Sequence, residues 1–107
     1  VSAARYATSA DPRGHLPVFE YQCNGHTIMI DRETSYVRFT GIWQALGHTK
    51  ADVVRLLEAS PELEPVVRKI RGGFLKIQGT WLPFDVALNL SRRTAFNIRD
   101  ALVPLFG

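Results

Sequence analysis

The chain has 107 residues, of which 46% are apolar and 21% are charged, with a formal net charge of +3 and an isoelectric point of about 9.4. These values predict one folded domain and exclude a disordered or low-complexity chain. A single cysteine, Cys23, excludes an internal disulfide framework and a cysteine-based zinc site, and it favours a reducing compartment. Because no apolar run of about 18 residues and no charged-then-apolar leader occurs, we expect neither a membrane span nor a signal peptide.

The first third of the chain predicts an N-terminal arm followed by a small antiparallel sheet. Residues 1 to 17 contain several proline and glycine turn signals and no sustained period, so we expect a partly ordered arm ahead of one folded domain at residues 18 to 107. Asn24-Gly25 tolerates the positive φ angles of a two-residue hairpin turn. The strands expected here are Val18 to Cys23, Thr27 to Ile30 and Tyr36 to Phe39.

Two short helices should follow the sheet. Thr40 is expected to cap the first helix with its hydroxyl, and Gly47 to end it. Thr49 and Asp52 have the spacing of a capping box at the start of a second helix, which should end near Ala59. This spacing fits a helix-turn-helix, and it fits an ordinary helical hairpin equally well.

A cation-rich hairpin is the next predicted element. Its strands, Val66 to Arg71 and Leu75 to Gln78, should meet at Gly72-Gly73, because paired glycines supply positive φ angles. Such a hairpin can follow a phosphate backbone and reach into a groove, or it can be an edge hairpin kept soluble by its charges. Because side chains alternate along a strand, at least one of its first three cations should point inward or along the sheet. The cations are Arg68, Lys69, Arg71 and Lys76.

The C-terminal part predicts two more helices. Pro83 should open a helix that runs to Leu90, with Arg92-Arg93 at its carbonyl end, where cations are favourable. Thr94 should cap a last helix, Ala95 to Val103. The chain therefore predicts a hairpin with a third strand, two helices, a basic hairpin and two helices. This α+β order is the connectivity of a winged helix-turn-helix, with the basic hairpin as the wing.

Three motifs, GIWQALG, RGGFLKIQGTWLPFDVALNLS and IRDALVPLFG, occur in this order, and together they resemble the APSES domain of fungal transcription regulators, a relative of the KilA-N domain. The resemblance covers nearly all of the chain from Val18 to Phe106. It implies a nuclear, sequence-specific binder of double-stranded DNA that uses a helix-turn-helix and a wing. The most distinctive block consists of Gly72, Gly73, Phe74, Lys76, Gln78, Gly79, Thr80, Trp81 and Pro83.

The resemblance also implies which wing residues face DNA. Carried over by position, Lys69, Lys76 and Gln78 face the duplex, and Gly72-Gly73 permits a close approach of the tip. Arg71 is a departure, because cell-cycle members of the family have glutamine before the paired glycines. Arginine there favours a narrow minor groove or a guanine edge, so the recognition sequence of those members does not transfer. The form RGGFLKIQGTWLP is more similar to a stress-associated repressor branch.

The second predicted helix supplies further candidates. Lys50 at its start and Arg55 on its exposed face stand where a recognition helix contacts phosphates or bases. His48 fits either a phosphate contact or a satisfied turn histidine. Arg92-Arg93 fits either a phosphate contact or a stabilised helix end. The aromatic side chains fall at buried periodic positions and are assigned to the core, namely Trp43, Trp81, Phe84, Phe96 and Phe106.

Other functions find less support in the residues. No metalloprotease, Walker, nucleophile-elbow or paired-carboxylate pattern occurs, so we expect no enzyme, no cofactor and no small-molecule substrate. The alternative is a module of the same fold that binds other proteins, or anchors chromatin or the nuclear envelope, without sequence-specific DNA binding. Such a module should dilute the cations of the wing and expose an apolar groove. The basic wing favours double-stranded DNA as the partner, and the oligomeric state stays open.

Overall fold

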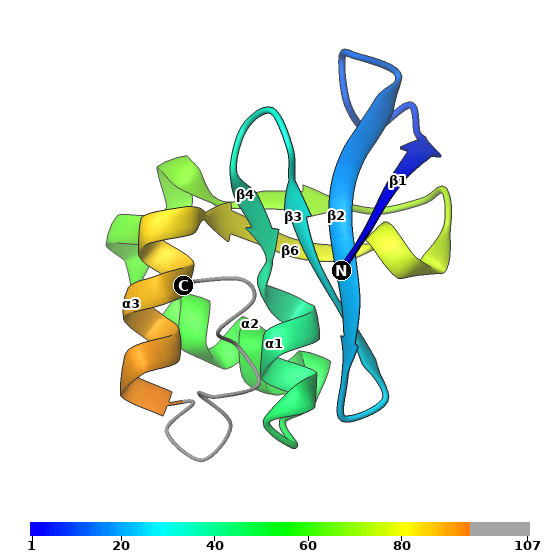
Figure 1. The fold of residues 1–107 in the computed structure, drawn as a ribbon. Coiled ribbons are helices and arrows are strands. Elements are labelled where there is room, and N and C mark those ends of the chain that lie inside the picture. The colour runs from blue at the N-terminus through cyan, green and yellow to red at the C-terminus, as the bar shows by residue number, and fades with distance from the viewer. Residues whose placement is uncertain (95–107) are drawn as a thin grey trace.

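The computed structural model describes residues 1 to 94, so the helix expected at Ala95 to Val103 lies outside the described residues. Within these residues, a six-stranded antiparallel sheet in the order β1-β2-β3-β4-β6-β5 is combined with three α-helices (Figure 1). The strands are β1 (Ser2–Ala7), β2 (His15–Cys23), β3 (His26–Asp31), β4 (Tyr36–Arg38), β5 (Arg68–Ile70) and β6 (Gly79–Pro83). The helices are α1 (Phe39–Ala45), α2 (Lys50–Glu58) and α3 (Phe84–Thr94), with 3-10 helices η1 (Pro61–Val66) and η2 (Leu75–Ile77).

The sheet has a hydrophobic cluster on each of its faces, because successive side chains of a strand point to opposite sides. Ile28 and Leu82 belong to the cluster that packs against α1, α2 and α3. Their neighbours Met29 and Trp81 belong to the second cluster, which includes Ile77 of η2. The helices therefore cover one face, and the loop of the wing curls under the other.

The N-terminal segment, expected to be an extended and partly ordered arm, contains strand β1. It pairs with β2 along its whole length, from Ser2 opposite Glu20 to Ala7 opposite His15. Strand β2 accordingly begins at His15, three residues before the predicted start at Val18. The sequence hides β1 because its residues are mostly small and exposed, so burial leaves no hydrophobic period. Whether a domain cut at Val18 folds without the preceding residues stays a prediction.

The helix pair agrees with the sequence at its second helix and differs at its first. The capping box of α2 is confirmed, with the Thr49 hydroxyl accepting from the Asp52 N–H at 3.2 Å and the Asp52 carboxylate accepting from the Thr49 N–H at 2.7 Å. The assignment of Thr40 as an N-cap is wrong, because α1 begins at Phe39 and Arg38 holds the cap position. Thr40 is buried in the first turn, where its hydroxyl accepts a hydrogen bond from the N–H of Thr80 on β6.

The wing differs from the predicted pair of strands. Its second strand is β6, beginning at Gly79, and the segment expected to be that strand forms η2 and an extended turn. The paired glycines do adopt positive φ angles, +97° at Gly72 and +78° at Gly73. The chain then turns inward because Ile77 is fully buried, and its carbonyl accepts a 2.9 Å hydrogen bond from the indole N–H of Trp81. The wing loop, residues 71 to 78, is thus a compact turn.

Helix α3 begins and ends later than the sequence predicted. Pro83 closes β6, opposite Tyr36, and the helix starts at the next residue. It passes the expected end at Leu90 because Ser91 is also buried and the apolar face continues into the next turn. Thr94, expected to cap the next helix, is the last described residue of α3. None of the helices in residues 1 to 94 is both long and apolar enough to cross a membrane.

Candidate nucleic-acid interface

A groove of about 240 Å³ separates α2 from the β5–β6 hairpin. We call it the basic groove. One wall is the start of α2, and the other is the end of β5 and the root of the wing. Four of the predicted DNA-contacting residues line it although they come from distant parts of the sequence. They are Lys50, Lys69, Arg71 and Gln78.

Alternation along β5 decides which wing cations face this groove. Lys69 and Arg71 are exposed and lie on the side of α2. Arg68 points to the other side, where its guanidinium donates to Asp11 at 2.7 Å and lies 5.4 Å from the ring centre of Tyr36. Arg68 is therefore the inward-pointing cation that the sequence required. Within residues 1 to 94, no carboxylate pairs with the groove cations Lys50, Lys69 and Arg71.

A buried charge network holds Arg68 in place. Asp11 accepts from both Arg13, at 2.8 Å, and Arg68, and Arg13 reaches on to Asp31 at 2.6 Å. Hydrogen bonds from Arg13 and then Arg68 hold the pKa of Asp11 far below its usual range, although burial opposes this. Burial also opposes the ionisation of Asp31, yet Arg13 and two backbone N–H groups keep its pKa lowered. The network joins the first loop, the β3–β4 turn and β5.

A second set of contacts fixes the root of the wing to the start of α1, and we call it the clasp. The Nε of Arg38 donates to the Gln78 carbonyl at 2.8 Å, and the N–H of Thr80 donates to the Thr40 hydroxyl at 2.9 Å. Between them, Gly79 has a φ of +135°, and a Cβ atom there would lie 2.7 Å from the Thr40 hydroxyl oxygen. Burial lowers the pKa of the Arg38 guanidinium. The clasp therefore holds the root of the wing, which forms one wall of the basic groove, against the start of α1.

The contacts of the clasp were not predicted from the sequence. Arg38 and Thr40 stand at a strand-to-helix junction, and neither type of residue signals a contact 40 positions away. The available signal was Gly79, a glycine inside the QGTW block that directly follows the strand expected at Leu75 to Gln78. A glycine there indicates a close backbone approach.

The tip of the wing is held by one contact within the wing and one contact to β1. The side-chain amide of Gln78 donates to the Gly73 carbonyl at 3.1 Å, and the Phe74 ring packs edge-on against Tyr6 with centroids 5.5 Å apart. Lys76 does not line the basic groove. Its Nζ lies 3.8 Å from Glu20 on β2, on the face of the sheet away from the helices. Within the part of the chain that the structure describes, no atom lies within 4 Å of a Cβ atom built at Gly72.

The remaining candidates lie outside the basic groove. Arg55 is exposed and donates a hydrogen bond to the Asp52 carboxylate. The hydrogen bond from the Thr49 N–H, and after it the one from Arg55, lower the pKa of Asp52 to about 2. His48 stacks on the Trp43 ring with centroids 4.3 Å apart, an arrangement that favours a satisfied turn histidine. Arg92 is exposed near the end of α3. Trp43 and Trp81 are buried, Phe84 packs against the core, and Phe96 and Phe106 lie outside the described residues.

The sheet, the helix pair and the wing define a winged helix-like α+β domain with a cationic groove between its helix and its wing. Comparison with known proteins narrows this class. Transcription factor MBP1 of Saccharomyces cerevisiae is 36% identical over 91 residues, which cover 85% of this chain and 11% of that protein. Transcriptional repressor XBP1 of the same yeast is 51% identical over 49 residues, which cover 44% of this chain and 8% of that protein. No family model matches the chain.

Solved structures agree with these relatives. A structure of MBP1 from Saccharomyces cerevisiae superimposes with a TM-score of 0.79 at 32% identity and covers 98% of this chain and 97% of that chain. The structure of a DNA complex of PCG2 gives a TM-score of 0.72 at 32% identity and covers 98% of this chain and 88% of that chain. The chain belongs to the APSES-type fungal transcription factors. It spans only about a tenth of the length of the curated relatives MBP1 and XBP1.

Proposed function

We propose that this domain binds double-stranded DNA sequence-specifically, as the DNA-binding part of a nuclear transcription regulator. The observation that carries the proposal is the convergence of Lys50, Lys69, Arg71 and Gln78 on one groove between a helix and a wing. The solved DNA complex of PCG2, which shares the fold, supports it. Because the relatives are transcription factors, we propose binding without catalysis.

The groove residues divide into two chemical roles. Lys50 and Lys69 are flexible point charges on opposite walls of the groove, and such charges are suited to phosphate oxygens. Arg71 presents a planar fork that matches a guanine edge or a narrow minor groove. Gln78 uses one amide hydrogen within the wing, so its carbonyl oxygen and second hydrogen stay available to a base. Arg71 and Gln78 therefore read sequence, and the lysines fix position.

Three further positions contribute at the edges of the interface. Arg55 adds positive potential beside the groove and is partly neutralised by Asp52. Gly72 and Gly73 carry no side chains themselves, so the wing backbone approaches the duplex closely at these two residues. Lys76 reaches a phosphate beyond the tip and leaves Glu20 when it does so.

The similarity to XBP1 is also relevant to the branch of the family. Identity with that repressor reaches 51% over 49 residues, against 36% over 91 residues with MBP1. Together with Arg71 before the paired glycines, this favours a repressor of the stress-associated branch. A selection from randomised duplexes with the isolated domain would test this, because a preferred site equal to that of the cell-cycle members would contradict it.

The salt dependence of duplex binding tests the proposed function. If about five phosphates are neutralised, the logarithm of the association constant should fall against the logarithm of the salt concentration with a slope of about −4 to −5. Replacing Lys69 by Ala should weaken binding to all duplexes alike and flatten that slope by about one. A flat slope, or no duplex binding at low salt, would support the protein-anchor alternative instead.

A further inference from the structure

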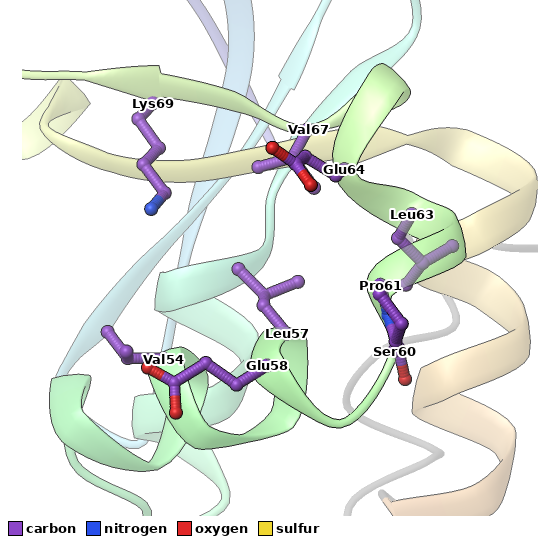
Figure 2. Close-up of a pocket in the computed structure, with 9 residues that line it drawn as sticks. All are labelled: Val54, Leu57, Glu58, Ser60, Pro61, Leu63, Glu64, Val67 and Lys69. Atoms are coloured by element: carbon purple, nitrogen blue, oxygen red, sulfur yellow. The ribbon is translucent and has the colours of Figure 1, made fainter.

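A second groove, of about 360 Å³, lies between α2, η1 and β5 (Figure 2). We call it the apolar groove. Figure 2 shows Leu57 pointing into it from α2 and Lys69 pointing toward it from β5. Val54 is 48% exposed there, and its apolar neighbours are only half-buried against the core or exposed. The apolar lining consists of Val54, Leu57, Pro61, Leu63 and Val67.

The edge of this groove is acidic. Glu58 at the end of α2 and Glu64 on η1 line it, and Glu62 is exposed on η1. Most carboxylates of residues 1 to 94 are paired with a cation, and of those that are not, three lie in the segment from 58 to 64. They are Glu58, Glu62 and Glu64, with Asp85 on α3 as the fourth. The acidic charge without a cationic partner is therefore concentrated beside the apolar groove.

This chemistry does not suit DNA. Carboxylates repel phosphates, and among residues 1 to 94 Lys69 is the only cation that lines the groove. The apolar groove shares Val54 and Lys69 with the basic groove, so the two are neighbours with opposite chemistry. The walls are also stiff, because Pro61 begins η1 and Pro65 lies inside it. A stiff site loses little conformational entropy when a ligand binds.

We propose that the apolar groove binds a peptide segment of a protein partner, in which a large apolar side chain is flanked by Lys or Arg. The volume is at the lower end of the range of about 300 to 1,000 Å³ usual for binding pockets, which fits one or two anchoring side chains. The anchor removes the surface of Val54, Leu57 and Leu63 from water, and the flanking cations meet Glu58 and Glu64. This inference goes beyond DNA binding and does not depend on it.

A fluorescent peptide tests the proposal. The probe is a labelled twelve-residue peptide of Lys, Leu and Ala, measured by anisotropy with the whole domain, and amide NMR shifts map its position. Binding should shift amides between residues 54 and 67. Replacing Glu64 or Glu58 by Gln should weaken the peptide about twofold to fivefold, the effect of one exposed ion pair. Asp85→Asn is the matched control, because it removes an equally unpaired carboxylate on α3 and should change nothing.

Two further arms separate this proposal from general charge attraction. The same peptide with Leu replaced by Ala should lose binding, and the peptide with Lys replaced by Glu should not bind. The proposal is overturned if Glu64→Gln and Asp85→Asn weaken the peptide equally, or if the shifts map to Lys50 and Arg71. It is also overturned if the domain self-associates through residues 54 to 67 without the peptide, because the occupant is then a second copy.

Discussion

The two charged regions of this domain, the buried charge network and the basic groove, both contain arginine, but only the network pairs its guanidinium groups with carboxylates of residues 1 to 94. In the buried network, Arg13 and Arg68 are held by Asp11 and Asp31, and the charges tie distant segments together. In the basic groove, Lys69 and Arg71 belong to or directly follow the same short strand as Arg68, but they meet no carboxylate within the described residues. The comparison teaches that position on a pleated strand, rather than the number of cations, decides which charges stabilise the fold and which are free to bind.

Removing Asp11 should produce the largest effect and break only the first region. In Asp11→Ala, two guanidinium groups lose their shared carboxylate, so we expect a loss of about 3 to 5 kcal/mol in the free energy of unfolding. Urea unfolding measures this. Arg71→Ala is the control, with an expected change within about 0.5 kcal/mol. Unfolding of Asp11→Ala at the same urea concentration as the parent would show that the network does not stabilise the fold.

Gly79→Ala should disrupt the clasp between the root of the wing and the start of α1. The new Cβ atom meets the Thr40 hydroxyl oxygen at 2.7 Å and the backbone stays at a φ of +135°, so we expect a loss of about 1 to 3 kcal/mol in the free energy of unfolding. Gly72→Ala is the matched comparison, because it has a positive φ and nothing within 4 Å. Equal losses in the two variants would indicate backbone strain alone, without close packing in the clasp.

Arg71→Ala should affect the second region and leave the first intact. We expect it to weaken a duplex selected for tight binding by about 1 to 3 kcal/mol more than a random duplex, with no change in urea unfolding. Titration of both duplexes measures the difference. Arg32→Ala removes the same charge from the β3–β4 turn and should leave the ratio between the duplexes unchanged. An equal loss on both duplexes in Arg71→Ala would make Arg71 a phosphate contact.

Lowering the pH should have the smallest effect on stability, and it should act through Asp11 and Asp31 of the buried network. The folded pKa values of Asp11 and Asp31 are lowered, so their contribution to stability is complete above the unfolded pKa of about 4 and is lost as the pH falls further toward the folded values. The melting temperature should therefore be lower at pH 3 than at pH 6. In Asp11→Asn the difference should shrink, and an unchanged difference would assign the acid sensitivity to other carboxyls.

Local chemistry in the sequence determined much of this domain. Hydroxyl and carboxylate spacing specified the capping box at Thr49, paired glycines specified the turn of the wing, and alternation required an inward cation on β5. The motif block around Gln78 was enough to indicate the family, as the relatives confirm. These features depend on residues only a few positions apart, which is why the sequence alone predicts them.

Contacts between distant segments were decided only by the tertiary structure. The sequence could not show that Arg68 meets Asp11, that Thr40 serves Thr80 and not its own helix, or that residues 75 to 77 turn inward. Each depends on which face of the sheet is covered and by what, and that is known only when all six strands are in place. The same assembly places the apolar groove beside the basic groove, because the second half of α2 faces η1 and its first half faces the root of the wing.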